Sequence, residues 1–134
     1  MSKKLEKAKE FHEKGFNCAQ SVALAFCEEL GLDEKIISAA AEGFGAGMGG
    51  RKEACGALSG AVMIAGLITS DKDMDAPKSK MQTYKTVSEM REKFSEHCGS
   101  TICAEIKDGE NGEPLISCEE CIAYGVKLVE EMLG

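Results

Sequence analysis

Apolar residues recur along this chain with the spacing of amphipathic helices, and strand-like alternation is almost absent. The pattern predicts helices over residues 2–14, about 18–30, between 33 and 43, about 54–68, about 77–96, briefly within 101–107, and from about 118 toward the end. Together, these segments predict an all-α fold. We expect a compact bundle of five to six helices in a single domain over residues 1–134.

Helix start signals support these boundaries. Asn17 followed by Gln20 has the spacing of a capping box, and Ser117 with Glu120 forms a Ser-x-x-Glu box before the last helix. We expect Asp33 to cap the third helix and Ser100 to cap the brief one.

Charge narrows the range of partners. The chain has 134 residues, with 23 acidic and 16 basic side chains and a formal net charge of -7. Such a surface repels phosphate backbones and anionic lipid, so we expect no nucleic acid, no membrane insertion, and a small-molecule or protein partner. The longest uncharged stretch, Ala54 to Ser70, is shorter than a membrane span. The first residues lack the apolar segment of a secretory signal, which predicts a cytoplasmic protein.

Cysteine is the unusual component of the composition. An odd total of 7 cannot pair fully within one chain, and reducing conditions disfavour structural disulfides. Reactive thiols and metal ligands are therefore the functional interpretations, while a small buried hydrophobe is the ordinary structural one. We expect the structural role for Cys27, in the middle of a helix, and for Cys98, at the end of one.

Four cysteines fall at predicted helix N-termini: Cys18, Cys55, Cys103 and Cys118. Unpaired backbone N–H groups and the positive end of the helix dipole favour a thiolate there, so the pKa of a thiol can fall from about 8.5 toward 7 or below. We therefore expect at least two of these four cysteines to lie close together in the fold.

Cys55 has the strongest case for reactivity on sequence grounds. It follows the glycine-rich stretch GFGAGMGG, and Arg51 and Lys52 lie nearby in the chain. Glycines permit positive φ angles and close backbone approach, and the basic residues favour a thiolate. We expect Cys55 to be the most reactive thiol. The bare face made by Gly56 and Gly60 favours close approach of a neighbouring helix or a substrate.

The motif Cys-Gly-Ala-Leu-Ser-Gly at residues 55–60, with GFNCAQSVALAFCEELGL upstream and GSTICAEI and SCEECIAYGVKLVEEML downstream, resembles one known family. It is similar to the redox-active proteins named for their C_GCAxxG_C_C cysteine pattern. The resemblance implies redox activity, with no substrate specified. It assigns the four recurrent cysteines to Cys18, Cys55, Cys103 and Cys118, although Cys121 completes a Cys-x-x-Cys with Cys118.

Three functions stay open at this point. The first is a thiol redox protein that uses these four cysteines for disulfide or electron-transfer chemistry, with a thiol-dependent oxidoreductase as its enzymatic form. The second is a metal-binding module in which Cys18, Cys55, Cys103 and Cys118 ligate an iron-sulfur cluster or zinc. The third is a non-catalytic interaction protein, with a homodimer as one form. The first ranks highest.

Overall fold

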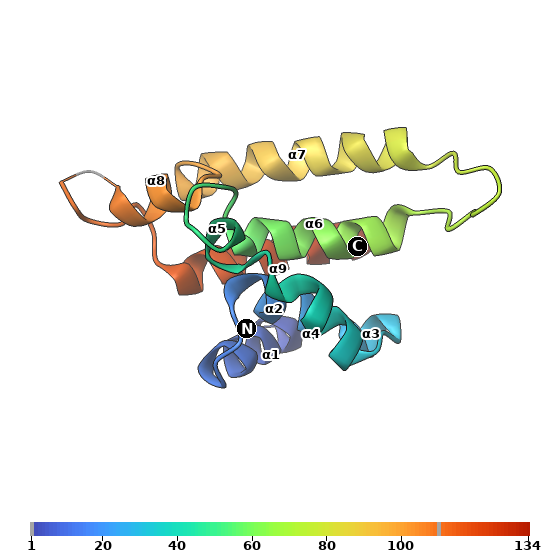
Figure 1. Cartoon of the computed structure of the whole chain (residues 1–134), viewed down its shortest axis with the longest axis horizontal. Coiled ribbons are helices and arrows are strands. Elements are labelled where there is room, and N and C mark those ends of the chain that lie inside the picture. The colour runs from blue at the N-terminus through green and yellow to red at the C-terminus, as the bar shows by residue number, and fades with distance from the viewer. Residues whose placement is uncertain (1, 110) are drawn as a thin grey trace.

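The computed structural model describes residues 2–109 and 111–134, and its regular structure over these residues is helical (Figure 1). The helices are α1 (Lys3–Glu13), α2 (Cys18–Leu24), α3 (Cys27–Leu30), α4 (Glu34–Glu42), α5 (Gly45–Met48), α6 (Gly56–Thr69), α7 (Lys80–Cys98), α8 (Cys103–Asp108) and α9 (Cys118–Leu133). The all-α prediction is confirmed. The expected number of five to six was too low for the described residues.

The additional helices arise at two places. The predicted helix over 18–30 is broken, because the Phe26 N–H donates to the Ala23 carbonyl three residues back at 3.2 Å instead of continuing the α pattern. This tighter turn sends the fully buried Phe26 ring into the core and starts α3 at Cys27. The second place is the glycine-rich stretch, where α5 contains two left-handed residues, Ala46 and Gly47.

Most expected caps are confirmed. Asn17 and Gln20 form the reciprocal capping box of α2, Asp33 caps α4, and Ser117 accepts the N–H of Glu120 at the start of α9. The prediction for Ser100 was wrong. The Ser100 hydroxyl accepts the N–H of Ile102, which is itself the N-cap residue of α8. The helix begins at Cys103, so Ser100 lies before the cap.

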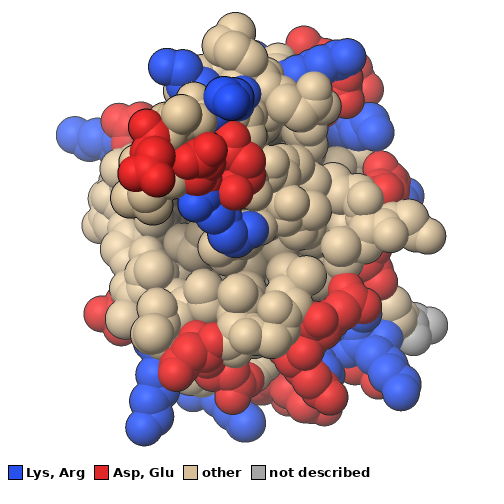
Figure 2. Space-filling view, turned by 90° about the vertical axis from the view of Figure 1, so that its right-hand side faces the viewer, with Lys and Arg blue, Asp and Glu red and all other residues tan. Residues whose placement is uncertain are grey.

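The helix predicted over 77–96 also shifts, to Lys80–Cys98, because the preceding residues belong to a loop that has its own hydrogen bonds. Asp71 accepts the N–H groups of Asp73 and Lys78, and Asp73 accepts those of Asp75 and Ala76. Such side-chain turns compete with helix formation. Figure 2 shows this end of the molecule, with acidic and basic side chains interspersed over it.

Helix α6 is the centre of the bundle. It packs against α2, α7 and α9, and its buried side chains are mostly small, including Ala57, Ala61 and Ala65. Its largest fully buried side chain is Ile64, and those on the surrounding elements are Phe26, Phe94, Ile106 and Ile122. Small residues on the central helix let the surrounding helices approach its backbone.

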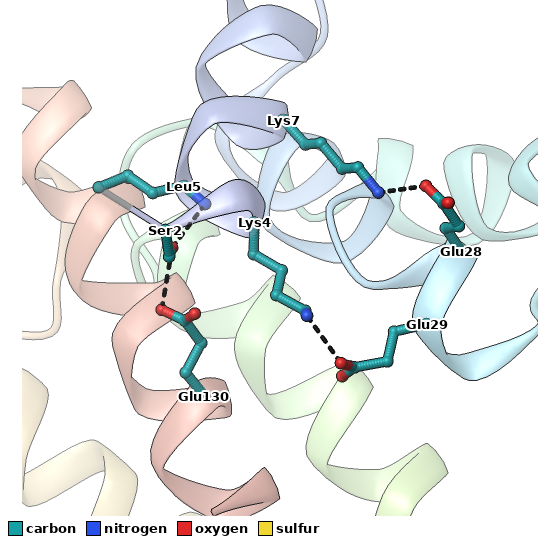
Figure 3. A network of polar contacts seen from close by, with 7 residues as sticks. All are labelled: Ser2, Lys4, Leu5, Lys7, Glu28, Glu29 and Glu130. Carbon is teal, nitrogen blue, oxygen red and sulfur yellow. Dashed lines mark hydrogen bonds and ion pairs between the residues drawn. The ribbon is translucent and has the colours of Figure 1, made fainter.

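Helix α1 lies across one side of the bundle and is held by polar contacts (Figure 3). Lys4 pairs with Glu29 of α3 at 2.7 Å, and Lys7 pairs with the adjacent Glu28. The Ser2 hydroxyl, which also accepts the N–H of Leu5, donates to Glu130 of α9. These contacts connect α1 to α3 and to α9.

Three glycines permit close contacts between the backbones of neighbouring helices. A Cβ atom at Gly60 would lie 2.5 Å from the Ala19 carbonyl oxygen of α2, and one at Gly56 would lie 3.1 Å from the Ala19 nitrogen. A Cβ atom at Gly125 of α9 would lie 2.8 Å from the Ala57 carbonyl oxygen of α6. The bare glycine face expected from the sequence thus receives a neighbouring helix.

Gly60→Ala should destabilise the fold, because the added methyl group meets backbone atoms that can only move with the whole of α2. We expect the free energy of unfolding, measured by urea titration, to fall by about 1–3 kcal/mol. Gly66→Ala is the matched control in the same helix, since a Cβ atom there meets nothing within 4 Å. It should stabilise by roughly 0.5–1 kcal/mol. Equal stability of the two variants would contradict the close contact.

Candidate functional site

Five of the cysteines line one cavity of about 200 Å³: Cys18, Cys55, Cys103, Cys118 and Cys121. The cavity lies among the N-terminal ends of α2, α6, α8 and α9, at the end of the molecule where α5 and α8 lie (Figure 1). All four cysteines singled out in the sequence are therefore brought together. The expectation that at least two of them approach each other is confirmed.

Local helix geometry places each of the four thiols. Cys18, Cys103 and Cys118 are the first residues of α2, α8 and α9, and Cys55 is the N-cap residue of α6. The helix N-termini thus converge on one space. Their unpaired N–H groups and dipoles make that space favourable for negative charge.

Backbone pairing holds the second and third of these cysteines in register. The Cys55 N–H donates to the Thr101 carbonyl at 2.7 Å, and the Cys103 N–H donates to the Glu53 carbonyl at 2.9 Å. This is the isolated bridge between Ala54 and Ile102. Residues that lie almost fifty positions apart in the chain are thereby fixed side by side.

The glycine-rich stretch closes one wall of the cavity. Gly47 has a positive φ of 57°, and a Cβ atom on it would lie 2.5 Å from the Cys103 Cβ. Glycine is therefore required there both for its backbone conformation and for space. The backbone at Gly47 therefore packs directly against Cys103.

The Cys118 thiol is the one most readily ionised. Its pKa is lowered to about 5, first by a hydrogen bond from the Cys18 thiol and then by the charge and hydrogen bond of Lys107, with a smaller contribution from His12. Burial opposes this shift without cancelling it. Cys118 is half-buried, so a reagent in the cavity can reach the thiolate.

The pKa of Cys18 is shifted in the opposite direction to that of Cys118. Its hydrogen bond to Cys118 and its burial raise the pKa of the Cys18 thiol well above the ordinary range. The pair of sulfur atoms thus has one negative charge. Cys118 carries this charge as a thiolate, and Cys18 keeps its proton. Two thiols in contact cannot both ionise readily in a partly buried site.

Cys55 departs from the sequence-based expectation. The N–H groups of Ala57 and Leu58 do lower its pKa, as a helix N-terminus should. A hydrogen bond with Cys121 and burial outweigh them, and the pKa of Cys55 is raised well above its usual value. The expectation of a lowered pKa at Cys55 was wrong because of its hydrogen bond with Cys121 and because the residue is only 7% exposed.

The other cavity cysteines are also protonated. Burial raises the pKa of Cys103, although Lys107 opposes the shift. The pKa of Cys121 is raised to about 12, since a hydrogen bond with Cys98 and burial outweigh the opposite effect of its hydrogen bond with Cys55. Only the thiol beside Lys107 is thus poised as a thiolate among the five that line the cavity.

Lys107 was not among the site residues predicted from the sequence, and Cys121 had only a secondary place among them. Lys107 lies four residues after Cys103 in α8, so both face the cavity from one side of that helix. The thiolate of Cys118 in turn raises the pKa of Lys107. The i+4 spacing was the available signal for the lysine, and the i+3 spacing from Cys118 was the signal for Cys121.

The remaining two cysteines lie outside the cavity lining. Cys27 is 1% exposed in the core at the start of α3, where burial raises its pKa to about 11, and its thiol lies near the Ala23 carbonyl. Cys98 is buried at the end of α7. The structural role expected for both agrees with these positions.

The cysteines of the described chain are free thiols. Within residues 2–109 and 111–134, no group of three or more histidine, cysteine or carboxylate side chains has the arrangement of a metal site. Over the same residues, no helix combines the length and apolar character needed to cross a membrane.

A helical protein whose helix N-termini converge on a cysteine-lined cavity is the class that this fold and site define. Residues 16–132 match the family model described as "Putative redox-active protein (C_GCAxxG_C_C)". The chain belongs to this family, and the resemblance seen in the sequence is confirmed. Comparisons with curated proteins and with solved structures gave no match.

Alkylation should locate the thiolate. In the reduced protein, we expect iodoacetamide to label Cys118 with a pH midpoint of about 5, because its pKa is lowered, and labelling should fade as the pH falls through that value. Cys55 should stay unlabelled until the pH lies well above the ordinary cysteine pKa, because its own pKa is raised. Peptide mass spectrometry of samples quenched between pH 4 and pH 10 measures both. A midpoint for Cys118 near the ordinary cysteine value of about 8.5 would contradict this assignment.

Lys107→Met should raise the labelling midpoint of Cys118 by about one pH unit or more, because the positive charge that stabilises the thiolate is lost. Methionine keeps a long apolar stem that can cover the same surface. Lys85→Met, at an exposed position of α7, is the matched control and should leave the midpoint unchanged. An unchanged midpoint in the Lys107 variant would remove the lysine from the site.

Proposed function

We propose that this protein is a thiol-disulfide redox protein in which Cys118 is the nucleophile and Cys18 is the resolving thiol. The observation that carries the proposal is the pairing of a half-buried, low-pKa thiol with a protonated thiol in one small cavity. This pairing is what disulfide exchange needs, since one sulfur attacks and the second releases the product.

The reaction has two exchange steps. The Cys118 thiolate attacks one sulfur of a substrate disulfide, forms a mixed disulfide and releases the other half of the substrate as a thiolate. The Cys18 thiol then loses its proton and attacks the Cys118 sulfur, which forms the Cys18–Cys118 disulfide and releases the second half. Two protein thiols are oxidised and one substrate disulfide is reduced.

Local charge favours this direction of attack. Lys107 and His12 both stabilise negative charge on Cys118. As Cys118 becomes neutral in the mixed disulfide, its thiolate no longer raises the pKa of Cys18, and Cys18 ionises more easily. The first step therefore activates the second.

The size of the cavity favours a small substrate. A volume of about 200 Å³ lies below the 300–1,000 Å³ range of sites for drug-sized ligands, so a low-molecular-weight disulfide suits it better. At pH 6, a thiol with pKa 5 gains about 300-fold in thiolate fraction over an ordinary cysteine of pKa about 8.5 and loses about 25- to 55-fold in nucleophilicity, which leaves roughly five- to tenfold.

The test is anaerobic exchange with bis(2-hydroxyethyl) disulfide at pH 6. Wild type should release two 2-mercaptoethanol molecules as the Cys18–Cys118 disulfide forms, and Cys118→Ser should lose this exchange. Cys18→Ser should stop at the mixed disulfide on Cys118, visible by mass spectrometry. Cys27→Ala is the matched control outside the cavity and should behave as wild type.

Two results would overturn the proposal. One is unimpaired exchange by Cys118→Ser, which would show that another thiol is the nucleophile. The other is stoichiometric iron or zinc in anaerobically purified protein, with no cavity thiol free to label. That result would favour the metal-binding alternative, in which Cys18, Cys55, Cys103 and Cys118 are ligands.

A further inference from the structure

Behind the outer pair lies a second pair of thiols that the exchange reaction does not use. Cys55 and Cys121 line the same cavity and are hydrogen-bonded to each other, with side chains only 7% and 2% exposed. Cys98 contacts Cys121 from α7 and does not line the cavity. The inner pair is therefore closed to large reagents and open toward the outer pair.

Close helix packing holds the inner pair together. The α6 and α9 backbones nearly touch at Gly125, whose added Cβ atom would lie 2.8 Å from the Ala57 carbonyl oxygen. Cys55 lies two residues before Ala57, and Cys121 lies one turn before Gly125. The contact between the two thiols thus lies within about one turn of the close backbone contact between α6 and α9.

The two pairs are linked along α9. Cys118 and Cys121 are three residues apart in that helix, so their side chains share one face. The Cys118 charge also raises the pKa of Cys121, and the Cys55 charge raises that of Cys18. Each inner thiol is therefore close enough to an outer thiol to feel its charge.

We propose that Cys55 and Cys121 form a second, internal redox site that receives the disulfide first made between Cys18 and Cys118. This inference rests on the proposed function, since the outer pair supplies the disulfide. The protein then reduces two molecules of a small disulfide substrate and gives up four electrons in all. The inner pair is an electron store that the substrate does not reach directly.

The transfer is an internal isomerisation and needs no further oxidant. The Cys121 thiolate attacks the Cys118 sulfur of the outer disulfide, forms a Cys118–Cys121 bond and releases Cys18, which takes a proton. The Cys55 thiolate then attacks the Cys121 sulfur, forms the Cys55–Cys121 disulfide and releases Cys118 as a thiolate. The inner thiols lose two protons, of which Cys18 takes one and solvent the other.

The equilibrium should favour transfer inward. The released Cys118 returns to its stabilised thiolate beside Lys107, while oxidation of the inner pair removes two thiols that are costly to ionise. A good leaving thiolate speeds exchange as well. The emptied outer pair is then ready to accept a second substrate disulfide.

The experiment is an anaerobic time course of the reduced protein with excess bis(2-hydroxyethyl) disulfide, followed by acid quenching and disulfide mapping. Wild type should lose four thiols per chain, two in a fast phase and two in a slow phase. The maps should show Cys18–Cys118 after the fast phase and both Cys18–Cys118 and Cys55–Cys121 after the slow phase, because transfer inward frees the outer pair for a second substrate disulfide. Cys55→Ala should lose only the two outer thiols. Cys118→Ser should keep Cys55 and Cys121 reduced, because the entry point is gone.

Each alternative outcome has one meaning. Formation of Cys18–Cys118 with Cys55 and Cys121 still free after prolonged exposure would overturn the internal site and leave the proposed function intact. Oxidation of the inner pair in Cys118→Ser at the wild-type rate would overturn the transfer, and a Cys98–Cys121 bond would overturn the assignment of Cys55. An absence of any oxidation at Cys118 in wild type would overturn the proposed function itself.

Cys27→Ala serves as the control for loss of one buried cysteine. It lies in the core away from the cavity, so it should lose four thiols with wild-type phases. Thermal unfolding of each reduced variant, compared with this control, checks that a lost phase reflects a missing sulfur atom and not a disturbed fold.

Discussion

The close contact of three helix backbones at α6 is the constraint on which the rest of this structure depends. Gly60 allows α2 to approach α6, and Gly125 allows α9 to approach α6, at distances below 3.0 Å that a Cβ atom would not tolerate. The first residues of α2 and α6 lie close to this contact, and the first residue of α9 lies two turns before Gly125. Cys18, Cys55 and Cys118 therefore line one cavity.

Within that space, similar local geometry gives different chemistry. Cys55 and Cys118 both lie at the N-terminus of a long helix, where backbone N–H groups favour a thiolate. The pKa of Cys118 is lowered because Cys18 and Lys107 add hydrogen bonds and charge, whereas burial and Cys121 raise that of Cys55. The helix dipole thus makes a modest contribution to the pKa of a thiol, and neighbouring side chains can reinforce or overcome it.

This difference divides the cavity into an outer and an inner part. The outer part has an accessible thiolate with a protonated partner, and the inner part has two protonated, buried thiols. In the proposed function, the outer part holds the sulfur atom that meets a substrate, and the inner part holds those that keep the product of oxidation. Membership of a redox-active family agrees with such an arrangement at the coarse level of redox activity.

The sequence by itself determined the helical class, most helix caps, and the placement of four cysteines at helix N-termini. These features are local, because a cap or an amphipathic period depends on residues within one or two turns. Only the tertiary structure decided that Cys118, and not Cys55, carries the charge. Burial of Cys55 and the contacts of Cys118 with Cys18 and Lys107 come from separate helices, and Cys18 lies a hundred positions from Cys118. The break at Phe26 has the same kind of origin, since a fully buried ring, drawn into the core, overrides the local preference for one continuous helix.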